Sequence, residues 1–478
     1  MRKLENIKPE RVFYYFEEIS KIPRDSYKEK EISDYLVKFG KEHNLECYQD
    51  EVYNVVLRKK ASAGYENAPG IILQGHMDMV CEKTEDSDHD FTKDPIDLIV
   101  DGNYLRANKT TLGADNGIAV AMMLAIAEND KLQHGPLEFL ITTSEEIDLG
   151  GAMALKPGVL KGEMLINLDS EDEGILTVGS AGGENIDVLL PLKRTKMKKG
   201  FAYKIKLQGF AGGHSGAEIH KGRENSNKAM NKILKTLNEK ADIYMVSVSG
   251  GSKDNAIPRV AEAVIASSEN IKETIEKVLK EVKEFYIKKE PQTELFFEEL
   301  SPVNEVMEKE VLTKYIGLID EIPTGVNSYM KEYPEIVESS DNLAIVTTEE
   351  NIIRIATSMR SSEPHVLDEI KEKIVKIAEK YNAGYEFSAK YPEWKYRPIS
   401  ALRDKAVEVW KKLFGKDMKV EVIHAGLECG AIYHNYPNID FVSLGPDMRD
   451  VHTPEEYLDI ASTGRVYDYV VELLKALK

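Results

Sequence analysis

Short apolar segments that alternate with helical ones constrain the fold of this chain more than any other feature. Within the first 180 residues, Ile71-Ile72-Leu73 is a short buried strand after Pro69-Gly70, and Leu137–Thr142 and Met164–Leu168 read as further strands. Residues 118–129 (IAVAMMLAIAEN) form a helix that is apolar on nearly every side. This alternation predicts an α/β layer with a mostly parallel sheet.

The pattern changes at about Gly183. Half-exposed strands at residues 202–207 and 243–249 are combined with amphipathic helices at residues 225–240 and 270–288. These features predict an inserted α+β domain, and α/β character returns after the linker YPEWKYRPIS. The expected domains are residues 1–182 together with 393–478 as a discontinuous catalytic domain, and residues 183–392 as the insertion.

The charge and the cysteines exclude several classes of function. Lys and Arg total 63 against 82 Asp and Glu, a net charge of −19, so we expect no nucleic-acid or membrane partner. Cys47, Cys81 and Cys429 are too few and too far apart for a disulfide framework or a thiolate zinc cage. The first residues, MRKLENIKPERVFYYF, lack the apolar core of a secretory signal, which favours a cytoplasmic location.

Side chains of the types that bind metal ions follow the predicted strands or their turns. The carboxyl ends of parallel strands meet at one edge of a sheet, where ligands bind. The segments that place His, Asp or Glu there are His76-Met77-Asp78, Asp115 between Gly113 and Gly117, Glu145-Glu146, Asp169, and His452 in DVHTPEE.

Each segment alone has a less specific explanation. His76 and Asp78 point to the same side of an extended segment, so Asp78 could fix the His76 tautomer, but a surface turn would look the same. Asp115 could be a helix N-cap. The adjacent carboxylates of Glu145 and Glu146 either share a cation or form an exposed acidic turn.

The segments are more informative together, because they combine two histidines, several carboxylates and no cysteine. Such a set suits two divalent, zinc-like ions, which can share a water molecule, lower its pKa and polarise a carbonyl. The sequence contains no G-x-S-x-G elbow, H-E-x-x-H pair, Walker A loop or G-x-G-x-x-G fingerprint. We therefore favour metal-dependent hydrolysis.

Five motifs in order, GHMDMV, LGADNG, TTSEE, NLDSED and DVHTPEE, resemble those of the M20 family of co-catalytic zinc peptidases. HAGLECG and SLGPDMRDVHTPEE resemble its aminoacyl-histidine dipeptidase branch (Xaa-His dipeptidases, PepD-type). The resemblance extends from about residue 10 to the C-terminus and implies a di-zinc α/β catalytic domain with an α+β lid. The resemblance implies that the metal ligands are His76, Asp115, Glu146, Asp169 and His452, with Asp115 bridging the two ions. It also implies that Asp78 orients His76 and that Glu145 is the general base.

The resemblance also assigns substrate-binding residues to the insertion. His214, in GGHSG, would donate to the oxyanion, and Asn255 would hold the substrate backbone. Arg360 would pair with the substrate carboxylate, and Gly426 would offer backbone groups. Without the resemblance, a turn histidine between glycines would be the favoured interpretation of His214, and half of a surface ion pair would be an equally good interpretation of Arg360. His220, His424 and Glu428 lie near these motifs and are assigned no role.

The expected activity is hydrolysis of dipeptides, including Xaa-His dipeptides, by a water that bridges two ions and is deprotonated by Glu145. The ions would be Zn²⁺, with Mn²⁺ or Co²⁺ as alternatives, and the chain could form a homodimer. Two other functions stay open: another M20 amidohydrolase, such as a tripeptidase or N-acyl-amino-acid deacylase, and a catalytically silent binding protein on the same scaffold.

Overall fold

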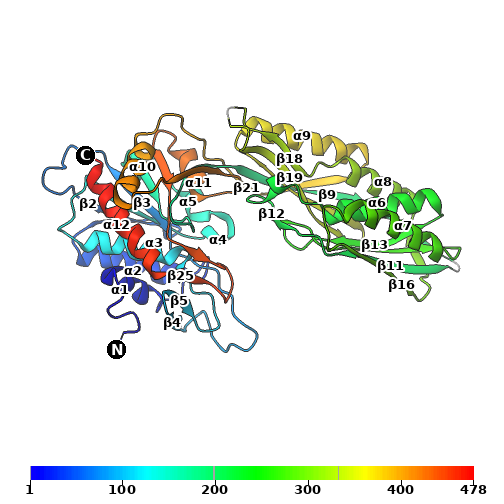
Figure 1. Cartoon of the computed structure of the whole chain (residues 1–478), viewed down its shortest axis with the longest axis horizontal. Helices are drawn as coiled ribbons and strands as arrows, with labels where there is room; N and C mark the ends of the chain where they lie inside the picture. Colours follow the sequence, from blue (N-terminus) through cyan, green and yellow to red (C-terminus); the bar gives the residue numbers. More distant parts are fainter. Residues whose placement is uncertain (1, 198–199, 332) are drawn as a thin grey trace. The chain divides into compact units, whose positions relative to one another are not determined.

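The computed structural model describes residues 2–197, 200–331 and 333–478. The chain forms two compact units. The first contains the residues up to Ser180 together with Trp394–Val422 and Leu427–Lys478, and the second contains Ala181–Glu393 and Ile423–Gly426. In Figure 1 the blue and red ends of the chain belong to the first unit, and the green and yellow middle forms the second.

The first unit is built on an eight-stranded sheet with the order β1-β2-β6-β3-β7-β23-β8-β22. Its centre is parallel, because β3 pairs in parallel with β6 and β7, and β23 pairs in parallel with β7. Antiparallel pairs flank this centre, namely β1 with β2, β2 with β6, and β23 with β8. The strands are β1 (Glu46–Gln49), β2 (Val55–Lys59), β3 (Ile71–His76), β6 (Leu137–Thr142), β7 (Met164–Asn167), β8 (Ile175–Ser180), β22 (Lys419–Ile423) and β23 (Asp440–Ser443).

Helices cover both faces of this sheet, so its central strands are buried on both sides. Alternate strand residues enter different cores: Leu73 and Phe139 pack with α1, α2, α3, α10 and α12, whereas Ile72 and Leu140 pack with α5 and α11. The prediction of a mixed α/β fold with a mostly parallel central sheet is confirmed. The helices are α1 (Glu10–Ile19), α2 (Lys30–Glu42), α3 (Ala114–Glu128), α4 (Glu145–Asp148), α5 (Gly150–Ala154), α10 (Ala401–Phe414), α11 (Glu428–Asn435) and α12 (Ile460–Ala476).

A smaller sheet in the first unit carries the loop that contains His452. Its order is β24-β25-β5-β4, and its printed pairs are antiparallel. His452 lies between β24 and β25, so this sheet fixes both ends of the histidine loop. The strands are β4 (Leu98–Asp101), β5 (Tyr104–Ala107), β24 (Met448–Arg449) and β25 (Tyr457–Asp459).

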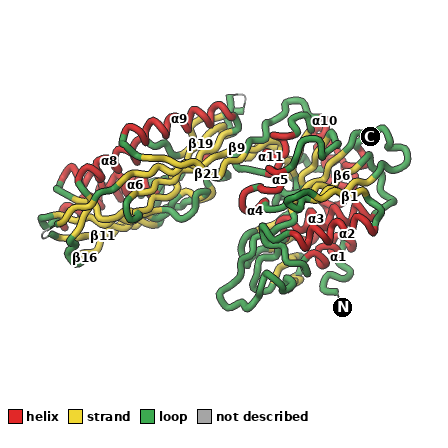
Figure 2. The backbone as a smooth tube through the Cα atoms, turned by 180° about the vertical axis from the view of Figure 1, so that it is seen from behind, coloured by secondary structure: helices red, strands yellow, loops and turns green. Residues whose placement is uncertain are grey.

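The second unit contains a nine-stranded antiparallel sheet with the order β16-β11-β15-β13-β19-β20-β9-β21, in which β18 also pairs with β19. Helices α6, α7, α8 and α9 pack on the sheet and form one core with it (Figure 2). The main elements are β9 (Gly182–Pro191), β11 (Phe201–Gln208), β13 (Tyr244–Gly250), β15 (Ala261–Ser267), β16 (Glu294–Leu300), β18 (Gly325–Tyr329), β19 (Val337–Thr348), β20 (Ile352–Ser361), β21 (Gly384–Tyr391), α6 (Ser226–Lys240), α7 (Lys272–Tyr286), α8 (Lys309–Glu321) and α9 (Pro364–Lys380).

Short elements complete the second unit. They are the pair β10 (Arg194–Lys196) and β17 (Glu305–Met307), the pair β12 (Gly213–His214) and β14 (Ala256–Ile257), and the 3₁₀ turn η1 (Ile219–Lys221). The N-terminus of α6 is capped as its sequence favours, because the Asn225 side chain accepts hydrogen bonds from the amides of Asn227 and Lys228. Among the described residues, no helix is both long enough and apolar enough to cross a bilayer.

Candidate metal centre

His76 is the last residue of β3, and Asp78 lies two residues beyond it. Both side chains are buried, and His76 Nδ1 lies 3.2 Å from Asp78 Oδ1. Asp78 also accepts hydrogen bonds from Ser26 Oγ (2.7 Å) and from the amides of Glu145 (3.1 Å) and Glu146 (3.3 Å). Asp78 therefore joins the end of β3 to the segment after β6 and leaves His76 Nε2 free to face other groups.

Asp115 lies between the two histidines. Its Oδ1 is 3.2 Å from His76 Nε2, and its Oδ2 is 3.0 Å from His452 Nε2. The N-cap of α3 is Gly113, in the left-handed region at φ 67°, and Asp115 itself has the non-helical angles φ −76° and ψ 109°. Asp115 is therefore not an N-cap, and its two carboxylate oxygens face different imidazoles.

Glu146 and Asp169 complete the two groups around Asp115. Glu146 Oε2 lies 2.9 Å from His452 Nε2, and Asp169 Oδ1 lies 3.5 Å from His76 Nε2. The structure thus brings together one set of His76, Asp115 and Asp169 and a second set of His452, Asp115 and Glu146, with Asp115 shared.

The electrostatics of this cluster favour a bound cation. Burial opposes charge on His452, but its hydrogen bonds with Asp115 and Glu146 outweigh burial and raise the pKa of His452 to about 11. Burial raises the pKa of Asp169 to about 7. Glu146 Oε1 is buried and has no hydrogen-bond partner among the described residues.

Candidate ligand atoms from both sets also lie close together. One ligand atom each from His76, Asp115 and Glu146 lies within 4.8 Å of the others. Imidazole nitrogens with carboxylate oxygens and without thiolates form a donor set that suits Zn²⁺, Mn²⁺ or Co²⁺. The residues present therefore fit divalent metal ions.

Glu145 lies beside the cluster, at the first position of α4. Its Oε2 is 3.9 Å from His76 Nε2, and its side chain is 18% exposed. Burial, reinforced by the negative charges of Asp169 and Glu146, raises the pKa of Glu145 well above its usual range, although His76 opposes the rise. This environment favours the protonated form of the carboxyl group, which suits a residue that takes up a proton during a reaction.

Sequence analysis gave no role to Glu428, which the structure places under this cluster. Its Oε2 accepts hydrogen bonds from Gln74 Nε2 (2.6 Å) and Thr142 Oγ1 (2.8 Å), and it is fully buried. Burial raises the pKa of Glu428 to about 8, and the charge of Asp169 adds to the rise. Glu428 lies in the motif HAGLECG, which could have drawn attention to it. No local sequence pattern, however, indicated that a glutamate at the start of α11 is buried.

His214, Asn255, Arg360 and Gly426 all lie in the second unit. His214 Nδ1 accepts hydrogen bonds from the amides of Gly216 (3.1 Å) and Ala217 (3.0 Å), so the imidazole proton resides on Nε2. Burial and the nearby charge of Arg360 lower the pKa of His214. His214 is therefore a neutral imidazole with Nε2–H available to donate.

Arg360 lies near the end of β20 and is only 6% exposed, so it is not part of a surface ion pair. Its Nη1 donates to the Tyr391 hydroxyl (2.7 Å), and its Nε meets no acceptor among the described residues. Gly426 borders the same tyrosine, because a Cβ at Gly426 would lie 2.7 Å from the Tyr391 ring. The Asn255 carbonyl accepts from the amide of Ser215 (2.8 Å), which fixes its turn beside the His214 loop.

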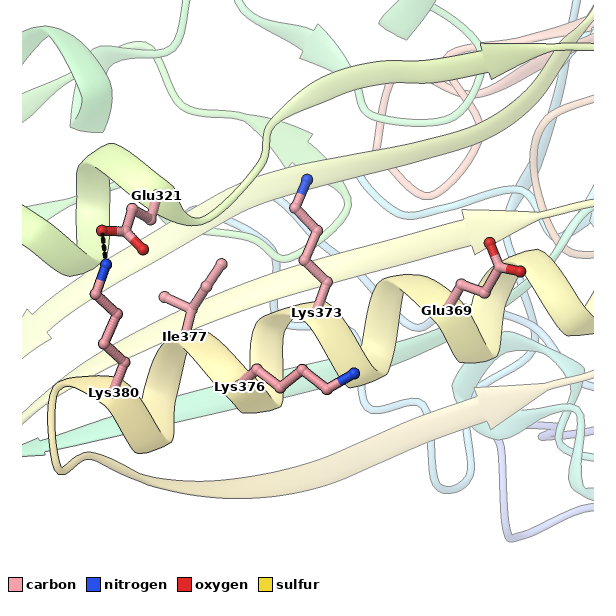
Figure 3. Close-up of a pocket in the computed structure, with 6 residues that line it drawn as sticks. All are labelled: Glu321, Glu369, Lys373, Lys376, Ile377 and Lys380. Carbon is pink, nitrogen blue, oxygen red and sulfur yellow. Dashed lines mark hydrogen bonds and ion pairs between the residues drawn. The ribbon is translucent and has the colours of Figure 1, made fainter.

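A surface cavity of about 520 Å³ in the second unit contains none of these groups (Figure 3). Lys380 Nζ forms an ion pair with Glu321 Oε1 at one end of the cavity, at 2.5 Å. Exposed lysines without a convergent partner do not define a ligand site. The lining residues are Glu321, Glu369, Lys373, Lys376, Ile377 and Lys380.

Comparisons with known proteins agree with the site. The model of peptidase family M20/M25/M40 matches residues 72–476, which is most of the chain. The chain belongs to this family.

Two relatives match over their full length. The chain is 36% identical over 486 aligned residues to the cytosol non-specific dipeptidase of Escherichia coli (strain K12), covering 100% of this chain and 99% of that protein. It is 35% identical to the crystal structure of aminoacylhistidine dipeptidase from Vibrio alginolyticus, with a TM-score of 0.89 over 99% of this chain and 98% of that one. Aminopeptidase PepT from Bacillus cereus ATCC 10987 shares the fold at 15% identity, with a TM-score of 0.58 over 98% of this chain and 99% of that one.

Proposed function

We propose that this protein is a metal-dependent dipeptidase whose substrates include Xaa-His dipeptides. The main support for this proposal is the position of Asp115. Its two carboxylate oxygens lie 3.2 Å from His76 Nε2 and 3.0 Å from His452 Nε2, and Glu145 lies beside them. The activity is consistent with family membership and with the two full-length relatives, which are named as dipeptidases. The name of the Escherichia coli relative supports a cytoplasmic location for this protein as well.

The cluster would hold two divalent ions, and zinc is the proposed metal. His76 and Asp169 would bind one ion, His452 and Glu146 the other, and Asp115 both. When bound, the ions would polarise the scissile carbonyl and lower the pKa of water at the site. Asp78 would hold His76 in the tautomer whose Nε2 binds metal.

Glu145 is the proposed general base. Its carboxylate would take a proton from the attacking water and later pass it to the leaving amine. The amide of Glu145 is hydrogen-bonded to Asp78, so the residue that orients His76 also positions the base. The raised pKa of Glu145 suits a group that must hold a proton between these two steps.

The second unit would recognise the peptide. The Nε2–H of His214 would donate to the oxyanion, because its Nδ1 is already used by two backbone amides. Arg360 would pair with the free carboxylate of the substrate, since Tyr391 occupies Nη1 only and leaves Nε available. Asn255 and Gly426 would hold the peptide backbone. Recognition of a free carboxylate favours short peptides over internal bonds of long chains.

Release of histidine from Gly-His and β-alanyl-His tests the proposal. The purified protein would be stripped of metal and then resupplied with zinc or manganese, and we expect release only after resupply. A Glu145→Gln variant that binds metal normally is the matched control and should release almost none. If no metal restores hydrolysis of dipeptides, while tripeptides or N-acetyl amino acids are cleaved, the substrate class proposed here is wrong.

A further inference from the structure

Glu456 lies four residues after His452 and binds the loop that contains Asp115. It is 2% exposed. Its Oε2 accepts hydrogen bonds from the amides of Leu112 (2.7 Å) and Gly113 (3.0 Å), and its Oε1 accepts from those of Ala114 (2.8 Å) and Asp115 (3.4 Å). One buried carboxylate thus binds four consecutive backbone amides, the last of them that of Asp115.

Arg24 binds the same loop through a backbone carbonyl. It follows α1 and is 2% exposed. Its Nη1 donates to the carbonyls of Met77 and Asp78, both at 3.1 Å, and its Nη2 donates to the carbonyl of Gly113. Arg24 therefore joins the turn after β3, which contains Asp78, to the loop that leads into Asp115.

We propose that Arg24 and Glu456 are positioning residues that set the spacing of the two metal sites. Arg24 fixes the Asp115 loop relative to the turn that follows His76, and Glu456 fixes the same loop relative to the segment that contains His452. The proposal rests on the proposed function, because it concerns the ions that this site would bind. Neither residue contributes an atom to the ligand sets described above.

Stability alone is a poor explanation for this arrangement. Burying an unpaired charge costs several kcal/mol, and apolar side chains often replace buried ionic groups without loss of stability. The hydrogen bonds of the Arg24 guanidinium and the Glu456 carboxylate all end on the segments around Asp78 and Asp115. Both residues therefore act where a small displacement would change the separation of His76, Asp115 and His452.

Glu456→Gln tests the role of the carboxylate without changing its size. The amide has one acceptor oxygen, so its NH₂ group would face two of the four backbone N–H donors. We expect the affinity for one or both ions to fall 10- to 100-fold, as for other groups that orient metal ligands. Affinity would be measured by titrating metal-stripped protein with zinc against a competing chelator, and the visible spectrum of the Co²⁺ form would report ligand geometry.

Two further variants make the test decisive. Glu455→Gln makes the same chemical change at the exposed neighbouring position and should leave zinc affinity unchanged. Arg24→Lys keeps the charge but loses the forked donors, and it decides the matter if Glu456→Gln does not fold. Zinc affinity within twofold of wild type in the folded variants, whatever their melting temperature, would overturn the inference. If wild-type protein itself binds no divalent ion, the proposed function fails instead.

Discussion

Substitution of Asp78 by asparagine should weaken metal binding by an amount that follows from its contacts. Asp78 Oδ1 faces His76 Nδ1 (3.2 Å) and the Glu145 amide (3.1 Å), while Oδ2 accepts from Ser26 Oγ (2.7 Å) and the Glu146 amide (3.3 Å). Asparagine keeps one acceptor oxygen and turns an NH₂ group toward two donors. At least two contacts with a charged acceptor are therefore lost or become repulsive.

The size of the effect can be bounded in two ways. A hydrogen bond to a charged group contributes about 1.5–3 kcal/mol. Loss of a partner that orients a metal-binding histidine lowers metal affinity about 10- to 100-fold, which corresponds to ~1.4–2.8 kcal/mol. Loss of the single contact to His76 under the first bound, and loss of the orienting partner under the second, both predict zinc binding about 10- to 100-fold weaker at the ion that His76 would bind. The value of kcat/KM should fall as well, because the amide of Glu145 loses the same partner.

The assay is a competition titration of metal-stripped protein with zinc and a chromophoric chelator, performed on wild type and Asp78→Asn. Ser26→Ala is the matched control, because it removes one neutral donor and leaves the carboxylate, and we expect less than a tenfold effect. Two zinc ions bound by Asp78→Asn with wild-type affinity would refute the argument that Asp78 prepares His76 to bind metal.

Three further outcomes follow from the site and the second unit. Glu145→Gln should keep both ions and lose about 10²- to 10⁴-fold in kcat/KM, whereas unchanged turnover would remove it as the base. Tyr391→Phe should raise KM for dipeptides with little change for their C-terminal amides, because Arg360 loses the hydroxyl that holds Nη1; equal effects on both substrates would contradict this. Burial raises the pKa of Asp341 from 3.8 to about 7, so the folded state retains a proton that the unfolded chain releases, and stability falls as pH rises through this range. Asp341→Asn, which keeps an oxygen for Asn327, should be more stable than wild type at pH 8, by at most ~4 kcal/mol, and nearly equal at pH 4, as measured by thermal and urea unfolding.

The sequence predicted that the side chains of the candidate metal centre lie close together because their positions follow from topology. β3, β6 and β7 are neighbouring parallel strands, so residues just after each of them meet at one edge. His76, Glu145 and Asp169 all occupy such positions. The alternation of apolar segments was therefore sufficient to place these side chains close together, without any knowledge of side-chain packing.

Other features depend on contacts that no local pattern encodes. Asp115 could be read as a helix cap until the structure placed it beside His452, which lies 337 positions later in the chain. Arg24, in the polar segment IPRDS, resembles an exposed residue, because arginine is almost never fully buried unless it is paired. Its partners are backbone carbonyls contributed by distant segments. Because every residue has a backbone carbonyl, the sequence does not indicate which of them Arg24 contacts.

The glycines that flank Asp115 show how such a distant contact can still shape a motif. Gly113 has φ 67°, a conformation that glycine adopts readily, and a Cβ there would lie 2.4 Å from Arg24 Nη2. Gly117 has no such backbone requirement, and alanine at a helical position would be favoured by about 1 kcal/mol. A Cβ at Gly117, however, would lie 2.7 Å from the same guanidinium nitrogen and 3.3 Å from the ring of Phe16. In LGADNG, the second glycine therefore leaves space for the buried guanidinium of Arg24, which lies more than 90 residues earlier in the sequence. The glycines of this motif thus reflect the contact between Arg24 and the Asp115 loop, in addition to the requirement for the aspartate itself.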